Sequence, residues 1–194
     1  MTIKLLFFAG SQRKESWNKK LAKAAYNIAK KQDHVEATYL DLADYDMPIY
    51  NQDLEEESGL PDKAIALKNQ FIDCDGFFIA SPEYNSAYTP LLKNSLDWIS
   101  RKSDETEPML IAYQGKIAAL SAASPGGYGG LRGLIPLRMM LGNIGVHVLP
   151  NQMALSQCHE HFDQDDNINK KQYQDMLEKL VKDLVKTTSA LKAV

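Results

Sequence analysis

Short apolar runs alternate along this chain with longer stretches in which apolar residues recur every three or four positions. The runs occupy residues 3–9, 35–40, 76–80, 117–122 and 146–149, and each has the length of a buried strand. Helical spacing marks residues 17–32, 62–73, 90–101, 128–143 and 168–192. This alternation predicts an α/β fold, a doubly wound parallel sheet with helices on both faces. Five strands fit the order 2-1-3-4-5, in which a ligand lies beyond the C-terminal strand ends, between strands 1 and 3.

Two polar stretches interrupt the alternation. Residues 41–59 are acidic and rich in turn formers, and we expect them to form a long surface loop beside the site. Residues 101–114 are expected either to overhang a neighbouring site or to be mobile. With 194 residues, the chain fits a single domain over residues 1–194 with a substantial core.

Composition narrows the class of protein. A net charge of −3 argues against a nucleic-acid partner, which would require a basic face. No apolar run approaches the roughly 18 residues of a membrane helix, and the first run is too short for a signal peptide. Two cysteines do not indicate a disulfide framework. We therefore expect a cytoplasmic protein with neither a membrane nor a nucleic-acid partner.

The loop after the first apolar run has the composition of a phosphate site. Ser11, Ser16 and Asn18 can supply neutral donors, and Arg13 can offer its guanidinium to a dianion. The loop opens a helix, whose N-terminal N–H groups attract phosphate. It lacks the P-loop ending and the G-x-G-x-x-G run, so a terminal monophosphate is expected. In the alternative interpretation, Ser16 only caps the helix and Arg13 is solvated.

Three segments together resemble the NADPH-dependent FMN reductase family of flavodoxin-like proteins, which includes quinone, chromate and azo-dye reductases. The matching runs are G-S-x-R-x-x-S-x-N from Gly10 to Asn18, P-E-Y-N from Pro82 to Asn85, and L-K-N-x-x-D-W from Leu92 to Trp98. A loop over residues 121–130 also lies where the family has one. The resemblance covers residues 3–147 and implies a flavodoxin-like fold that binds FMN.

The resemblance implies that the flavin ring lies against Pro82, Glu83, Tyr84 and Asn85. Pro82 shapes the turn, and the backbone N–H groups of the three residues after it can point at the polar edge of the ring. The alternative is a plain strand-to-helix turn capped by Asn85. Many family members have glycine after this motif, where this chain has Ser86.

A third loop supplies weaker candidates for cofactor contact, namely Ser124, Gly126 and Gly127. Adjacent glycines let the backbone approach a ligand closely or adopt positive φ. The alternative is a flexible turn before a helix.

The function that follows is an FMN-containing NAD(P)H oxidoreductase. Hydride would pass from NADPH or NADH to the flavin, and then on to a quinone, free flavin or similar acceptor. The cofactor performs the chemistry, so no side chain is assigned as catalytic. The alternatives are a flavodoxin-like electron carrier, which would not oxidise NADPH rapidly by itself, and a non-enzymatic flavin-binding regulatory module.

A polar cluster near the C-terminus invites a metal interpretation, with members Cys158, His159, Glu160, His161, Asp163, Asp165 and Asp166. Such a cluster between a strand and a helix is typical of a solvated loop, so no metal is predicted, and activity is expected to survive chelation.

The third and fourth helical stretches predict a homodimer or homotetramer. Leu91, Leu92, Leu96, Trp98 and Ile99 cover over half of the third helix. Apolar residues run nearly all round the fourth, from Leu131 to Ile144. Helices apolar on every side need a second partner surface, and the flavin pocket would then borrow a wall from the neighbouring subunit.

Overall fold

The computed structural model describes residues 1–164 and 166–193 and contains one parallel sheet. Its strands are β1 (Ile3–Ala9), β2 (Val35–Asp41), β3 (Gly76–Ala80), β4 (Ile117–Ala123) and β5 (His147–Leu155). They lie in the order β2-β1-β3-β4-β5, and every neighbouring pair is parallel. The predicted flavodoxin-like sheet order is confirmed.

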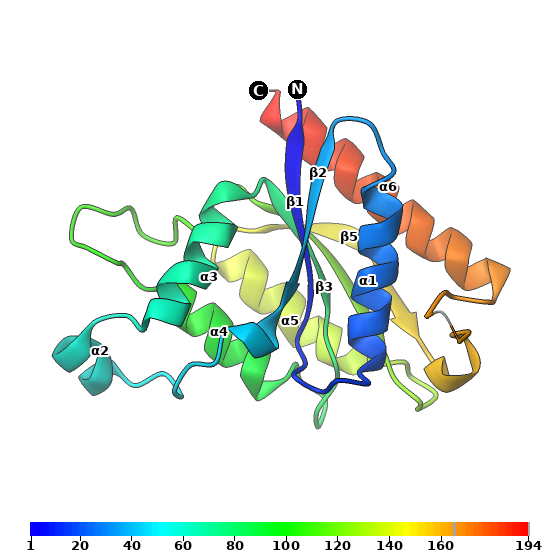
Figure 1. Ribbon diagram of the computed structural model, residues 1–194, viewed down its shortest axis with the longest axis horizontal. Helices are drawn as coiled ribbons and strands as arrows, with labels where there is room; N and C mark the ends of the chain where they lie inside the picture. The colour runs from blue at the N-terminus through cyan, green and yellow to red at the C-terminus, as the bar shows by residue number, and fades with distance from the viewer. Residues whose placement is uncertain (165, 194) are drawn as a thin grey trace.

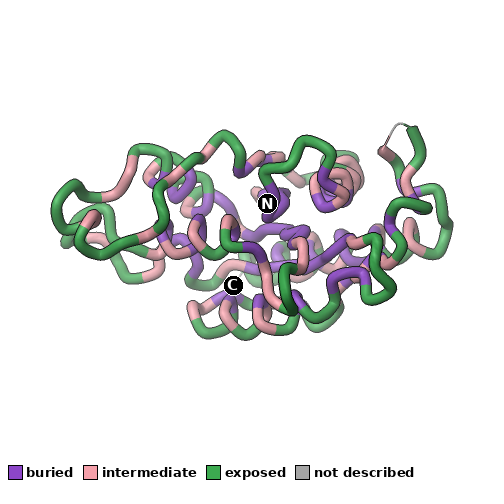
Figure 2. Tube along the Cα trace, turned by 90° about the horizontal axis from the view of Figure 1, so that it is seen from below, coloured by how far each residue is buried: buried purple, intermediate pink, exposed green. Residues whose placement is uncertain are grey.

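Helices cover both faces of the sheet, as Figure 1 shows. The helices are α1 (Trp17–Ala29), α2 (Gln52–Ser58), α3 (Asp62–Asp73), α4 (Pro90–Ser100), α5 (Leu131–Asn143) and α6 (Lys171–Lys192). Alternate residues of β1 enter two separate cores: Leu5 and Phe7 pack with α1 and α6, whereas Leu6 and Phe8 pack with α3, α4 and α5. Viewed from below, the buried trace forms a middle layer between exposed outer segments (Figure 2).

The segment between β2 and α3 contains more structure than the predicted loop. It begins with a 3-10 helix, η1 (Leu42–Asp44), and continues to α2. None of the residues of α2 is buried, so the helix has no apolar stripe for a sequence pattern to detect. The expectation of a long surface loop over residues 41–59 was therefore wrong in part, because the segment contains η1 and α2.

The segment that joins η1 to α2, residues 45–51, lies across α4; we call it the strap. Trp98 Nε1 donates to the Pro48 carbonyl oxygen at 2.7 Å, and Asn94 Nδ2 donates to the same oxygen at 2.9 Å. The Asn94 carboxamide oxygen also accepts from the Tyr50 amide at 2.7 Å. The strap and the core together bury Trp98. Asn94 and Trp98 of the L-K-N-x-x-D-W run therefore have a structural role.

Residues 101–107 are held in place by a buried lysine. Lys68 of α3 is buried, and its Nζ donates to the Arg101 carbonyl at 2.5 Å and to Ser103 Oγ at 3.2 Å. The same ammonium forms an ion pair with Glu107. A buried lysine needs such partners, and this one anchors the start of the stretch predicted to overhang or to move.

Strand β5 extends beyond the predicted residues 146–149 and is irregular. Its register against β4 shifts between Ala118 and Leu120, so residues 149–151 fall outside the regular pairing. Arg138 of α5 donates to the Leu149 carbonyl at 2.7 Å and to the Gln152 side chain at 3.0 Å. The guanidinium thus satisfies an acceptor that the irregularity leaves open.

Candidate functional site

Three loops meet where β1, β3 and β4 end, at the lower edge of the sheet in Figure 1. They are residues 10–16, 81–89 and 124–130, and they carry the residues predicted to bind a cofactor. The Gly10 amide donates to the Ala80 carbonyl at 3.0 Å, and the Ser81 amide donates to the Ser121 carbonyl at 2.8 Å. The sheet ladder therefore continues into the loops and holds their first residues side by side.

The first loop carries the four residues predicted to bind phosphate, and two of their side chains, Ser16 and Arg13, lack a capping bond or an ion pair among the described residues. Ser16 is the N-cap of α1, yet its side chain makes no capping hydrogen bond. Ser11 is buried, and its Oγ accepts from the Arg13 amide at 3.3 Å. The Arg13 side chain is exposed and forms no ion pair with any described residue. The Ser16 hydroxyl therefore makes no cap, whereas the exposed Arg13 side chain is compatible with the alternative in which it is solvated.

Asn18 has a structural role that sequence reasoning missed. Its Nδ2 donates to the Ala123 carbonyl at 2.8 Å, and its Oδ1 accepts from the Ala123 amide at 2.9 Å. The buried carboxamide thus closes the end of β4 onto α1. Of the donors of Asn18, only the backbone amide and the second side-chain N–H remain for the predicted contact with phosphate.

The 82–87 turn is a tight hairpin. The Tyr84 amide donates to the Ala87 carbonyl at 2.8 Å, and the Ala87 amide donates back at 3.0 Å. Asn85 and Ser86 both have positive φ, 52° and 66°, as a two-residue type I′ connection requires. The prediction that the Tyr84 amide faces a ligand is corrected, because the hairpin uses it. The amides of Glu83 and Asn85 have no acceptor among the described residues.

The Glu83 side chain is nearly buried and contacts the first turn of α5 within its own chain. Its Oε2 accepts from the backbone amides of Arg132 at 3.1 Å and Gly133 at 3.3 Å. Its Oε1 accepts from Arg132 Nε at 2.8 Å. The carboxylate therefore ties the second loop to the start of α5.

Backbone freedom in the third loop is required at Gly129 and Gly130, whose φ angles are 61° and 88°. Gly126 and Gly127 do not have positive φ, and a Cβ on Gly127 would meet nothing within 4 Å. Ser124 Oγ accepts from the Gly126 amide at 3.1 Å. This open backbone suits close approach of a ligand rather than a special turn.

Thr89 joins the site although the sequence did not single it out. Its hydroxyl donates to the Gly10 carbonyl at 2.7 Å and accepts from the Leu92 amide at 3.2 Å as the cap of α4. The signal for the cap was present, since threonine precedes proline at the helix start. The tie to Gly10 depends on tertiary placement.

The polar cluster after β5 packs against the body of the protein. Phe162 stacks on Trp17 with ring centroids 5.6 Å apart, and His161 lies 4.8 Å from the ring of Tyr173. Cys158 is a buried free thiol, and burial raises its pKa to about 11. Asp165 lies outside the described residues. Across residues 1–164 and 166–193, no group of three or more His, Cys, Asp or Glu side chains is arranged to hold a metal.

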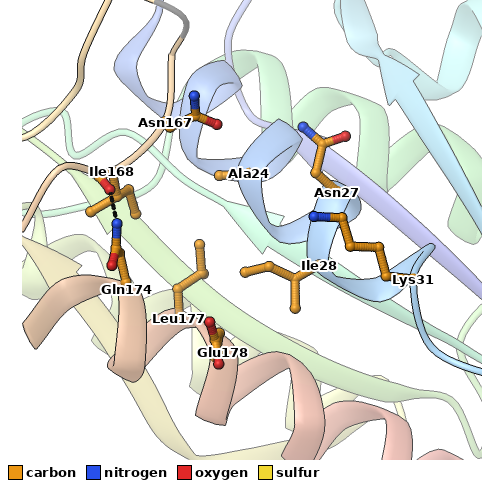
Figure 3. A pocket seen from close by; sticks show the side chains of 9 residues that line it. All are labelled: Ala24, Asn27, Ile28, Lys31, Asn167, Ile168, Gln174, Leu177 and Glu178. Atoms are coloured by element: carbon orange, nitrogen blue, oxygen red, sulfur yellow. Dashed lines mark hydrogen bonds between the residues drawn. The ribbon is translucent and has the colours of Figure 1, made fainter. Parts of the chain in front are cut away.

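A groove of about 300 Å³ lies between α1 and α6, as Figure 3 shows. Ile28 and Leu177 supply apolar surface, and the side chains of Asn27, Lys31 and Glu178 line it as well. Its lining contains none of the residues predicted to bind a cofactor. The candidate site is therefore the set of three loops at the strand ends.

Comparison with known proteins identifies the family to which this chain is similar. Residues 3–160 match the family model for NADPH-dependent FMN reductase. A 2-hydroxy-1,4-benzoquinone reductase from a Burkholderia species is 32% identical over 169 residues, covering 87% of this chain and 86% of that protein. An NAD(P)H-dependent FMN reductase from Pseudomonas aeruginosa is 31% identical over 163 residues, covering 83% of this chain and 82% of that one.

A solved structure matches almost the whole chain. The flavoenzyme NAD(P)H:(acceptor) oxidoreductase FerB from Paracoccus denitrificans aligns with a TM-score of 0.81 and 26% identity, covering 97% of this chain and 98% of that one. Within the described residues, no helix is both long and apolar enough to cross a membrane.

Proposed function

Because this chain belongs to the NADPH-dependent FMN reductase family, we propose that it is an FMN-dependent NAD(P)H oxidoreductase that reduces quinones or similar small acceptors. One observation carries the proposal beyond the family match. Among residues 1–164 and 166–193, the start of α1 presents the Ser16 hydroxyl without a capping bond and the Arg13 guanidinium without an ion pair. A phosphate monoester would satisfy these groups together with the free helical amides.

The loops also fit the rest of the cofactor. Free backbone amides at Glu83 and Asn85 are donors for the polar edge of a flavin, and the half-exposed Tyr84 offers an aromatic face beside them. Ser124, Gly126 and Gly127 form the opposite wall, where the backbone is open to close approach. We assign Ser11, Arg13, Ser16 and Asn18 to the phosphate, and the second and third loops, with Pro82 shaping the turn, to the ring.

The chemistry belongs to the cofactor. When bound, FMN would accept hydride from NAD(P)H and deliver the electrons to the acceptor. The chain holds the phosphate and directs fixed donors at the ring edge, which favours negative charge there. We assign no side chain as a proton donor.

A spectrum of the purified protein, followed by addition of NADPH or NADH without oxygen, tests the proposal. We expect flavin absorption that bleaches on mixing with the nucleotide and returns when a quinone is added. Flavin absorption that survives NAD(P)H would favour an electron carrier or a regulatory module. A protein that does not retain FMN would overturn the assignment.

We also propose that the chain forms a homodimer or homotetramer through α5. Ile135 and Met139 are 63% and 64% exposed. Leu131 and Tyr128 continue the same exposed stripe into the third loop, residues 124–130. Such a stripe is typical of a protein–protein contact. The companion argument from α4 was wrong, because Leu92, Leu96, Trp98 and Ile99 are buried within the chain.

Light scattering across a concentration series checks the oligomer. We expect a mass of at least twice 21.7 kDa, with activity falling on dilution as the neighbouring wall of the pocket is lost. A monomer with full activity would contradict the proposal.

We further propose that residues 1–194 form a single FMN-binding domain in the cytoplasm, where the free thiols of Cys74 and Cys158 would stay reduced.

A further inference from the structure

We propose that the Glu83 carboxylate is a positioning residue of the flavin slot, which fixes the third loop against the second and sets the charge between them. The inference rests on the proposed function, since it concerns the same site. Glu83 lies in the second loop, yet within the described part of the chain its side chain hydrogen-bonds to Arg132 and Gly133 in the first turn of α5.

Helix α5 begins without a cap of its own. Its N-cap is Gly130, which has a φ of 88° and no side chain to accept a hydrogen bond. The amides of Arg132 and Gly133 are therefore orphan donors of the helix start. The Glu83 carboxylate accepts from both, so a residue 49 positions away from Arg132 performs the capping.

The same carboxylate aims a guanidinium. Arg132 Nη2 lies 2.6 Å from Glu83 Oε1, and Arg132 Cζ lies 5.2 Å from the centroid of the Tyr128 ring. Tyr128 is an exposed residue of the third loop. Side-chain contacts thus run from Glu83 through Arg132 to Tyr128, and they connect one wall of the slot to the other.

Packing shows that the two walls are held close. A Cβ added to Gly133 would lie 3.0 Å from the Ala87 carbonyl oxygen and 3.2 Å from Glu83 Cβ. The first turn of α5 therefore rests directly on the hairpin that carries the ring contacts. The Glu83 side chain is only 9% exposed, so water does not compete strongly for its hydrogen bonds.

Charge gives the contact a second consequence. The N-terminus of α5 and the Arg132 guanidinium are both positive, and Glu83 is the anion that balances them. Removing only the negative charge leaves a positive field beside the slot, which favours the reduced, anionic cofactor. Removing only the Arg132 charge has the opposite effect.

The test uses Glu83→Gln and Arg132→Gln, with Glu55→Gln as the matched control. Glu55 pairs with Arg101 at 2.9 Å outside the three loops, and its carboxylate is 14% exposed, close to the 9% of Glu83. We expect the midpoint potential of bound FMN to rise in E83Q, to fall in R132Q and to stay unchanged in E55Q. In steady-state assays, E83Q and R132Q should change kcat, whereas E55Q should change neither kcat nor KM.

Hydrogen exchange supplies a readout that needs no cofactor. In Glu83→Ala, the Arg132 and Gly133 amides should exchange about ten- to a hundredfold faster, the loss expected for hydrogen bonds to a charged group. E83Q, which keeps an acceptor, should retain part of this protection.

The positioning role would be overturned by equal midpoint potentials in the unmodified protein, E83Q, R132Q and E55Q. It would also be overturned by potential shifts of the same sign in E83Q and R132Q. In either case, FMN binding by the unmodified protein would still support the proposed function. Unchanged exchange in E83A would also overturn the positioning role. If the unmodified protein failed to bind FMN, the proposed function would fall first and this inference with it.

Discussion

Gly129 offers a direct test of how the third loop is built. An added Cβ would lie 2.6 Å from the Ser156 nitrogen and 2.7 Å from the Leu155 carbonyl carbon, both backbone atoms at the end of β5. Backbone atoms cannot rotate away as a side chain can. The φ of 61° adds the cost of a left-handed conformation, about 1–2 kcal/mol. Overpacking adds about 1–3 kcal/mol.

We therefore expect Gly129→Ala to lower the free energy of unfolding by about 2–5 kcal/mol. At about 2–4 °C per kcal/mol for a chain of this size, the melting temperature falls by roughly 4–20 °C. The matched control is Gly127→Ala in the same loop, where the Cβ meets nothing within 4 Å. That variant should keep the stability of the unmodified protein but bind FMN more weakly, because its methyl group enters the ring slot.

Thermal and urea unfolding of both variants, without FMN, give the comparison. If Gly129→Ala proves as stable as Gly127→Ala, the close packing of the loop on β5 is not as described. If Gly127→Ala binds FMN with unchanged affinity, the third loop does not contact the ring.

Three further predictions concern separate parts of the molecule. Arg13→Ala removes a charge-assisted contact of about 1.5–3 kcal/mol, so FMN affinity measured by fluorescence titration should fall roughly ten- to a hundredfold. Riboflavin affinity should stay the same, and equal binding of FMN and riboflavin by the unmodified protein would refute the phosphate site. Ser86→Gly should stabilise the hairpin by about 0.5–1 kcal/mol in urea unfolding, since glycine tolerates its φ of 66°, whereas Ser86→Ala should not. Treatment with EDTA should leave turnover unchanged; loss of activity with rescue by zinc would mean that the residues after β5 hold a metal.

The sequence predicted those parts of the fold that are buried on both faces. Strands β1 and β3 begin and end at the predicted residues, because, apart from Lys4 in β1, their side chains are small or apolar and are buried along their length. Helix α2 was missed because none of its residues is buried. The second half of β5 was missed although Met153 and Leu155 are buried, because Pro150 and Asn151 interrupt the apolar run in the sequence.

The candidate site divides in the same way. The type and order of the residues on the three loops could be read from the chain, because each loop follows a recognisable strand. The partners of Asn18, Glu83 and Thr89 could not, since each reaches a loop or strand end far away in the sequence. Such contacts depend on where the sheet places neighbouring strand ends.

The irregular outer strand β5 has a consequence for how copies of this protein can meet. A regular exposed strand edge is a template on which another chain can add a strand, and this is a common route to aggregation. Here Pro150 lacks an N–H, the pairing register is broken beside it, and Arg138 occupies the neighbouring carbonyl oxygen. Strand addition is thus disfavoured at residues 149–151 of this edge, which leaves the face of a helix rather than this part of the strand as the surface for association between copies.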